Sequence, residues 1–269
     1  MYEMQDPSTS ALTELEDLWP PLAVSAPRPG AGTGQQRRRR DTTLTRDGIV
    51  KTAVTLAGAE GPAAVNMRRI ATELGVGVMS LYWYVADKEQ LLDLMLDVVE
   101  GEGGIAQVSG DWEADFRQIA RQRRRALLKH PWVLQFMSGR EHVGPNALLH
   151  IERSLSVLDG LSLDTRTALH ILMTIDTYVT GSVLGELREI RVEEVQARAE
   201  LDDSEFAAGR REWMERLNKS GMFERVVRVF AEGIDPDAAQ TRTERFEFGL
   251  DCVLAGIAAL VPTMHHDSG

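Results

Sequence analysis

The sequence predicts an all-α protein with an N-terminal three-helix helix-turn-helix domain followed by a larger helical domain. Apolar residues recur three and four positions apart through most of residues 44–261, and no convincing stretch alternates as a half-buried strand does. Two short helical patterns meet at a glycine-containing turn at residue 75. The 269 residues, 43% of them hydrophobic, are sufficient for a sizeable core.

The first helix is predicted at residues 46–60, where Thr45 provides the N-cap. The second is predicted at 67–74, with Asn66 as its N-cap. Gly75 ends the second helix because glycine adopts the left-handed conformation of a helix C-terminus without a steric penalty. The expected core stripe of the first helix consists of Ile49, Val50, Ala53, Leu56 and Ala57.

The third helix is predicted at 78–84 and the fourth at 88–104. Asp87 caps the fourth helix, with Gln90 in the capping-box position. Its expected buried face consists of Leu91, Leu92, Met95, Leu96 and Val99. Three glycines at 101, 103 and 104 loosen its end, so we expect this helix to connect two domains that can move relative to each other.

The remaining helices are predicted at about 111–129, 145–158, 163–193, 203–219, 222–232 and 237–261. Pro131, Pro145 and Pro236 mark their boundaries. The domain prediction is therefore a flexible arm at 1–43, a helix-turn-helix domain at 44–90 and a larger helical domain at 91–269. The arm contains five prolines and ends in the run Arg37–Arg40, which is either a solvated cluster or a segment that enters the minor groove beside an operator.

The formal net charge of −11 conceals an uneven distribution. Residues 37–90 carry nine Lys or Arg and six Asp or Glu, whereas residues 91–269 have a balance of −10. A basic segment on an acidic body favours DNA binding through that segment and discourages non-specific binding elsewhere.

The segment Leu74-Gly-Val-Gly-Val-Met-Ser-Leu-Tyr-Trp-Tyr-Val-Ala-Asp-Lys closely resembles the DNA-binding signature of the tetracycline-repressor (TetR) family. The helix before it and the segment Phe246–Leu260 are also similar to parts of that family. The resemblance implies a cytoplasmic homodimer that binds a palindromic double-stranded DNA operator and is released by a small molecule. It implies DNA contacts from Arg46, Arg68, Val78, Met79, Ser80, Tyr82, Trp83, Tyr84 and Lys88.

Two of these positions depart from the polar residues that hydrogen-bond to bases. Val78 and Met79 offer only apolar contact, which in the major groove means the methyl group of thymine. Sequence specificity would then depend on Arg68, Ser80, Tyr84 and DNA shape. The alternative for Val78 is burial in the small three-helix core.

The resemblance also implies a ligand site in the helical body and dimerisation through helices near 165–185 and 241–260. The expected ligand-contacting residues are Trp112, Phe116, Trp132, Phe136, Met137, Met173, Asp176 and Thr177. An alternative is that about half of them are core residues. Tetracycline repressors hold a metal-bound drug with histidine and threonine, where this chain has Phe136-Met-Ser-Gly-Arg140. We therefore expect a large, partly aromatic natural product or drug that needs no metal.

Other classes of function find little support in the sequence. One cysteine, Cys252, excludes an internal disulfide and fits a reducing cytoplasm. No apolar run reaches the roughly 20 residues of a membrane helix, and no secretory signal is visible. No phosphate-binding loop, nucleophile elbow or zinc-protease motif occurs, so we expect no enzyme activity, no metal and no cofactor. The alternatives to a repressor are an activator or co-repressed regulator of the same family and, more remotely, a carrier or enzyme with a vestigial DNA-binding head.

Overall fold

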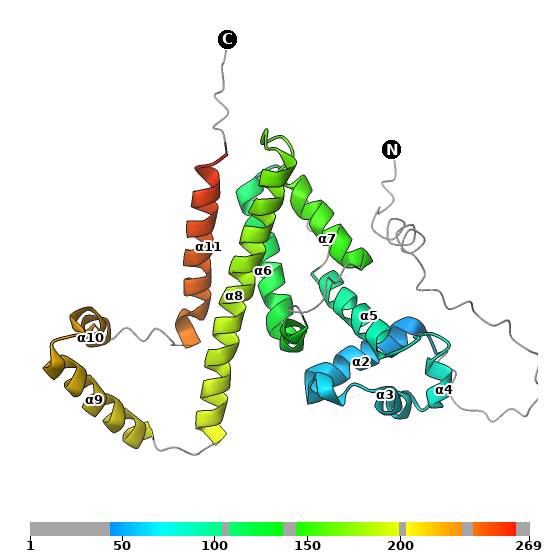
Figure 1. The fold of residues 1–269 in the computed structure, drawn as a ribbon, viewed down its shortest axis with the longest axis horizontal. Helices are drawn as coiled ribbons and strands as arrows, with labels where there is room; N and C mark the ends of the chain where they lie inside the picture. The colour runs from blue at the N-terminus through cyan, green and yellow to red at the C-terminus, as the bar shows by residue number, and fades with distance from the viewer. Residues whose placement is uncertain (1–43, 104–107, 137–143, 199–202, 233–238, 262–269) are drawn as a thin grey trace, which may run out of the picture. The chain divides into compact units, whose positions relative to one another are not determined.

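The computed structural model describes residues 44–103, 108–136, 144–198, 203–232 and 239–261, and these residues form helices and no strand (Figure 1). The predicted all-α fold is confirmed. The chain divides into two compact units, Met1–Leu163 and Asp164–Gly269. The predicted boundary at residue 90 divides the chain by function and not by compactness, so it stays a prediction.

The first unit begins with the three predicted helices of the head, α2 (Arg46–Glu60), α3 (Met67–Leu74) and α4 (Val78–Leu81). Thr45 and Asn66 cap α2 and α3 by accepting hydrogen bonds from the backbone N–H groups of Gly48 and Arg69. Gly75 has a φ of +67° at the C-terminus of α3. The predicted caps and the glycine turn are thus present, and a short 3-10 helix, η1 (Pro62–Ala64), links α2 to α3.

The third helix is shorter than predicted. It ends at Leu81, and residues 82–84 form a turn in which the N–H groups of Tyr84 and Val85 both donate to the carbonyl of Leu81. Leu81 and Val85 are both buried, and this turn brings them to the same core. The prediction of a helix to residue 84 was wrong. Two apolar residues four positions apart, here Leu81 and Val85, reach the same core from a continuous helix or from a helical turn followed by a tight turn.

The rest of the first unit consists of α5 (Lys88–Gly101), α6 (Trp112–Lys129), η2 (Pro131–Gln135) and α7 (Pro145–Ser156). Helix α5 packs against both α2 and α7, and η2 packs against α2. Asp97 on α5 caps α7, because its Oδ1 accepts hydrogen bonds from the N–H groups of Asn146 and Ala147 at 3.0 and 3.2 Å. The side chain of Asn146 donates back to the carboxylate and carbonyl of Asp97.

The second unit contains α8 (Thr165–Arg198), α9 (Asp203–Ser220), α10 (Glu224–Ala231), η3 (Ala239–Thr241) and α11 (Arg242–Ala258). Helices α8 and α11 lie side by side in Figure 1, and both contribute buried residues to the core of this unit. Those residues are Ile171, Leu172, Ile175, Val179 and Val183 on α8 and Phe246, Leu250, Leu254 and Ile257 on α11. Within the described residues, no helix has the length and apolarity required to cross a membrane.

An ion-pair network joins the ends of these two helices. The carboxylate of Glu189 on α8 accepts hydrogen bonds from Arg242 Nε at 3.1 Å and Arg245 Nη2 at 2.6 Å, and Arg242 also binds Glu193. Burial acts to raise the pKa of Glu189, but the hydrogen bonds and charges of the two arginines outweigh it and hold that pKa below its ordinary value. The ionised carboxylate therefore stabilises the folded unit.

We expect Glu189→Gln to lower the free energy of unfolding by about 1–2 kcal/mol at pH 7, because charge-assisted hydrogen bonds become neutral ones. Since the folded pKa is depressed, the stabilisation is complete above the unfolded value near 4.5 and is lost as the pH falls through the folded pKa. Urea unfolding followed by circular dichroism from pH 7 to 3.5 measures this. The control is Glu212→Gln, whose side chain is 72% exposed. If the free energy of unfolding differs between wild type and E189Q by the same amount from pH 7 to 3.5, this role of the ionised carboxylate is contradicted.

Candidate nucleic-acid interface

Four large side chains are exposed together on the head. In residues 44–103, the exposed large apolar and aromatic side chains are all within 79–84: Met79 is 73% exposed, Trp83 63%, and Tyr82 and Tyr84 41% each. Leu81 and Val85, in contrast, are no more than 1% exposed. The buried pair fixes this segment on the core and leaves the other four side chains at the surface, available to another molecule.

The start of α4 has few polar groups. Gly77 is the N-cap and has no side chain, Val78 is half-buried, and the Ser80 hydroxyl is the only polar side-chain group in the helix. Hydrogen bonding to base edges from α4 itself is thus limited to Ser80. Val78 is only half-buried, so complete burial in the three-helix core is not observed.

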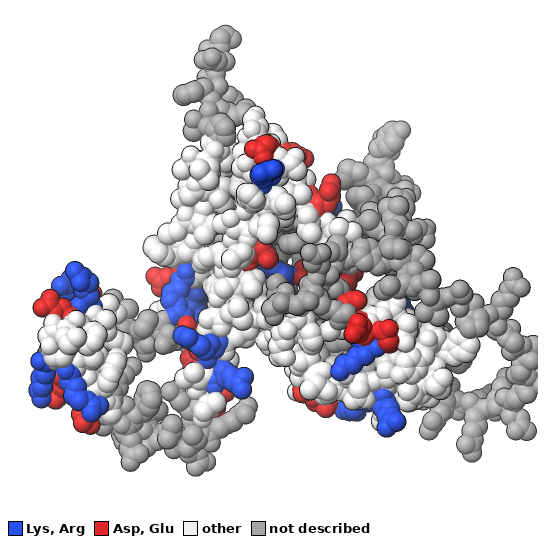
Figure 2. All heavy atoms as spheres, viewed as in Figure 1, with Lys and Arg blue, Asp and Glu red and all other residues white. Residues whose placement is uncertain are grey.

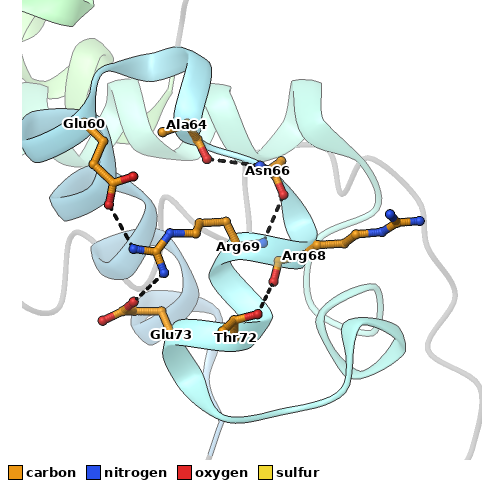
Figure 3. A network of polar contacts seen from close by, with 7 residues as sticks. All are labelled: Glu60, Ala64, Asn66, Arg68, Arg69, Thr72 and Glu73. Atoms are coloured by element: carbon orange, nitrogen blue, oxygen red, sulfur yellow. Dashed lines mark hydrogen bonds and ion pairs between the residues drawn. The ribbon is translucent and has the colours of Figure 1, made fainter.

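Two adjacent arginines on α3 have different surroundings (Figure 3). The guanidinium of Arg69 donates to Glu60 on α2 and to Glu73 one turn along α3, each at 2.9 Å, and so braces α3 against α2. The side chain of Arg68 points away from this network and is exposed. Of the two cations, Arg68 is the one placed to reach a phosphate or a base.

Lys88 and Arg46 are also exposed, and each is the first residue of its helix. Asp87 Oδ1 caps α5 by accepting from the Gln90 N–H at 2.8 Å, and Gln90 Oε1 accepts from the Ala86 N–H at 2.6 Å. Gln90 thus binds the N–H group of the residue before the N-cap, and not that of Asp87 as in the predicted capping box, while the predicted Asp87 cap itself is present. It holds Lys88 at a helix N-terminus, where the remaining N–H groups favour an anion.

The charge of the head is more balanced than expected. Residues 44–90 carry five Lys or Arg and five Asp or Glu, so the basic excess predicted for 37–90 comes from Arg37–Arg40 together with Asp41. The visible face of the head in Figure 2 shows isolated cations beside anions and no continuous basic surface. The arginine run and its expected role lie outside the described residues.

Polar contacts fasten the C-terminal end of α5 to α6, which the sequence analysis did not predict. Glu100 pairs with Arg123, and both side chains are largely buried. Glu102 Oε2 accepts from Lys129 Nζ at 2.7 Å and lies 2.9 Å from His130 Nε2. Burial acts to raise the pKa of Glu102, but Lys129 and His130 outweigh it and hold that pKa below the ordinary value. The helix that carries Lys88 at its start is thus anchored by charges at its end.

The ligand-contacting residues predicted in the first unit lie on α6 and η2. Trp112 and Phe116 are in edge-to-face contact, as are Trp132 and Phe136, with ring centroids 6.5 Å apart in each pair. Phe116 and Trp132 are buried, at 0% and 3% exposed. Trp132 Nε1 and His130 Nδ1 have no hydrogen-bond partner among the described residues. A buried indole N–H usually has a partner, so this pair of nitrogens is unusual.

The other predicted ligand-contacting residues lie elsewhere. Met173, Asp176 and Thr177 are on α8 in the second unit, where Met173 is 57% exposed, Thr177 is exposed and Asp176 is half-buried. Met137 lies outside the described residues. The contacts within each unit do not by themselves define a ligand site from these residues.

The two parts of the chain match two family models. Residues 49–95 match the model described as "Bacterial regulatory proteins, tetR family", and residues 106–261 match "Tetracyclin repressor-like, C-terminal domain". The first match includes α3, α4 and all four exposed side chains of 79–84.

Similar proteins include two repressors. The chain is 34% identical over 228 residues to the HTH-type transcriptional repressor DrrR1 of Streptomyces coeruleorubidus, covering 84% of this chain and 82% of that protein. It is 26% identical over 220 residues to the tetracycline repressor protein class A from transposon 1721 of Escherichia coli, covering 81% and 92%. Among solved structures, ActR of Streptomyces coelicolor in complex with actinorhodin is 29% identical, covers 82% of this chain and 99% of that one, and has a TM-score of 0.66.

Proposed function

Because the chain belongs to the tetracycline-repressor family, we propose that it is a DNA-binding transcriptional repressor that a small molecule releases from its operator. The observation that carries this proposal is the cluster of exposed side chains at 79–84, within the segment that matches the family's DNA-binding model. The family is one of transcriptional regulators and not of enzymes.

In this proposal the head lies in the major groove with α4 and its following turn against the DNA. Arg68 and Lys88 supply exposed cations for phosphates or base edges, and Tyr82, Trp83 and Tyr84 rest on the backbone. Arg46, exposed at the start of α2, would supply a further cation. Arg69 takes no part, because its guanidinium is held by two carboxylates.

The operator would be bound by a homodimer through α8 and α11. Both helices carry exposed apolar side chains opposite their buried stripes, among them Leu169 and Met173 on α8 and Phe248, 72% exposed, on α11. Small residues accompany them, since Gly181, Ala255 and Gly256 are exposed as well. An exposed face of apolar and small residues allows close helix packing in a two-fold interface.

Cys252 provides a test of this interface, because it is the one cysteine of the chain and is exposed on α11. We expect a short bis-maleimide to link two chains through Cys252 at micromolar protein, giving a covalent dimer on a denaturing gel. Cys252→Ser should abolish the product while leaving the dimer intact in light scattering. A native dimer that the reagent fails to link would place the interface away from this face.

The effector would be an oxygen-bearing, partly aromatic molecule. Trp132 Nε1, which has no partner among the described residues, can only donate a hydrogen bond, so it suits a carbonyl or hydroxyl oxygen of the ligand. The half-buried Trp112 and Phe136 supply aromatic surface on the same unit. Actinorhodin, which is bound in the similar ActR structure, is a suitable first probe.

The proposed function is tested by selecting random duplex DNA on the full-length protein at two salt concentrations. We expect one palindrome to be enriched and to survive the higher salt, and a panel of aromatic natural products that includes actinorhodin to contain a compound that releases it. Binding that stays unselective and disappears with salt would show that charge alone is at work and would contradict the proposal.

A further inference from the structure

We propose that Met79 reads the C5-methyl group of a thymine in each operator half-site, and that this apolar contact adds to the sequence specificity expected from Arg68, Ser80 and Tyr84. The inference rests on the proposed function and deepens it by naming the base and the chemical group that are recognised. It follows from the position of Met79, from the scarcity of polar side chains on α4, where Ser80 is the single one, and from the chemistry of the major groove.

The orientation of Met79 is fixed by the core on the other side of α4. Leu81 is two residues further along and is completely buried, and two positions in an α-helix are about 200° apart around the axis. The side chain of Met79 is therefore directed away from the core, and it is 73% exposed. Within residues 44–103 no other large apolar side chain is as exposed.

Hydrogen-bond recognition by α4 is almost absent. A thioether is at best a weak acceptor, Gly77 has no side chain and Val78 is apolar. Among the groups that base pairs present in the major groove, the thymine methyl is the one that an apolar side chain can contact. Cytosine lacks this methyl group, so the contact distinguishes thymine from cytosine at that position.

The test replaces single thymines of the selected operator, symmetrically in both half-sites, by deoxyuridine. This change removes only the methyl group and leaves base pairing intact. At one thymine position we expect affinity to fall about fourfold for each methyl lost, hence roughly 15-fold for the two half-sites, from the free energy of burying one methyl-sized group. Met79→Ala should bind the unmodified operator more weakly and show no further loss with deoxyuridine at that position, whereas Met79→Leu should keep the sensitivity.

The matched control is Met222→Ala, because Met222 is an equally exposed methionine, 78%, in the second unit. It should retain both full affinity and the full deoxyuridine effect. The inference is overturned if deoxyuridine at no thymine position lowers the affinity of the wild-type protein. It is also overturned if deoxyuridine lowers the affinity of Met79→Ala as much as that of the wild type. Both results leave the proposed function standing. Failure to select any operator overturns the proposed function and this inference together.

Discussion

Replacement of Arg68 by alanine should lower operator affinity about 30-fold or more while leaving the folded head intact. A base or phosphate contact contributes roughly 1–3 kcal/mol, and a dimer loses the contact in both half-sites. Arg68 is exposed and points away from the carboxylates that hold its neighbour, so its removal breaks no ion pair of the Arg69 network (Figure 3). Fluorescence anisotropy with the selected duplex, at several salt concentrations, measures the loss.

Arg69→Ala separates a contact with DNA from a structural role. The variant removes the ion pair that joins α3 to Glu60 on α2 and the pair with Glu73 within α3, so we expect a lower unfolding midpoint and a smaller loss of affinity than in Arg68→Ala. Lys219→Ala, whose side chain is 79% exposed on α9, serves as a charge-matched control without effect on binding. Equal losses of affinity in the two arginine variants would refute the division of roles between them.

Removal of the Asp97 carboxylate should destabilise the first unit by about 2–3 kcal/mol. Asp97→Ala takes away the cap of α7 and the partner of the Asn146 amide, and a lost cap together with charge-assisted hydrogen bonds accounts for this magnitude. Asp97→Asn retains one acceptor oxygen and should cost less. Urea unfolding followed by circular dichroism at pH 7 gives the free energies.

Gly144→Ala should have a similar effect through the same carboxylate. A Cβ atom at residue 144 would lie 2.1 Å from Asp97 Oδ1 and 2.3 Å from its Cγ, so the carboxylate would have to leave the α7 N-terminus. In the Asp97→Ala background the clashes with the carboxylate are gone and only the Cβ atom of residue 97, 2.7 Å away, still crowds the added methyl group, so the second substitution should cost less than it does in the wild type. Additive losses in the double variant would show that the two residues act independently and would contradict this account.

Helix positions were the part of the fold that local sequence could predict. The caps Thr45, Asn66 and Asp87 lie at the starts of α2, α3 and α5 as predicted, because a cap is a contact between residues three positions apart. The predicted end of α4 was three residues too far along the chain, since the burial of Leu81 and Val85 is compatible with a helix and with a turn.

Contacts between distant residues were beyond such reasoning. The apolar periodicity of α5 predicted its buried face but gave no indication that Asp97 would cap a helix 49 residues later, or that Glu102 would meet Lys129 and His130. The separate roles of Arg68 and Arg69 also depend on a distant residue, because Glu60 on α2 selects which arginine is bound. The unpartnered nitrogens of His130 and Trp132 became visible only with their surroundings.

The close fit between Gly144 and Asp97 has a consequence for how this chain can diverge. A Cβ atom at residue 144 would lie 2.1 Å from the Oδ1 atom, 2.3 Å from the Cγ atom and 2.7 Å from the Cβ atom of Asp97, and the carboxylate that caps α7 needs the space which glycine leaves. A substitution at residue 144 is therefore penalised most while Asp97 is present, and replacement of Asp97 by a smaller residue relieves part of that penalty. Across descendants of this chain, positions 97 and 144 should change together, although 47 residues separate them.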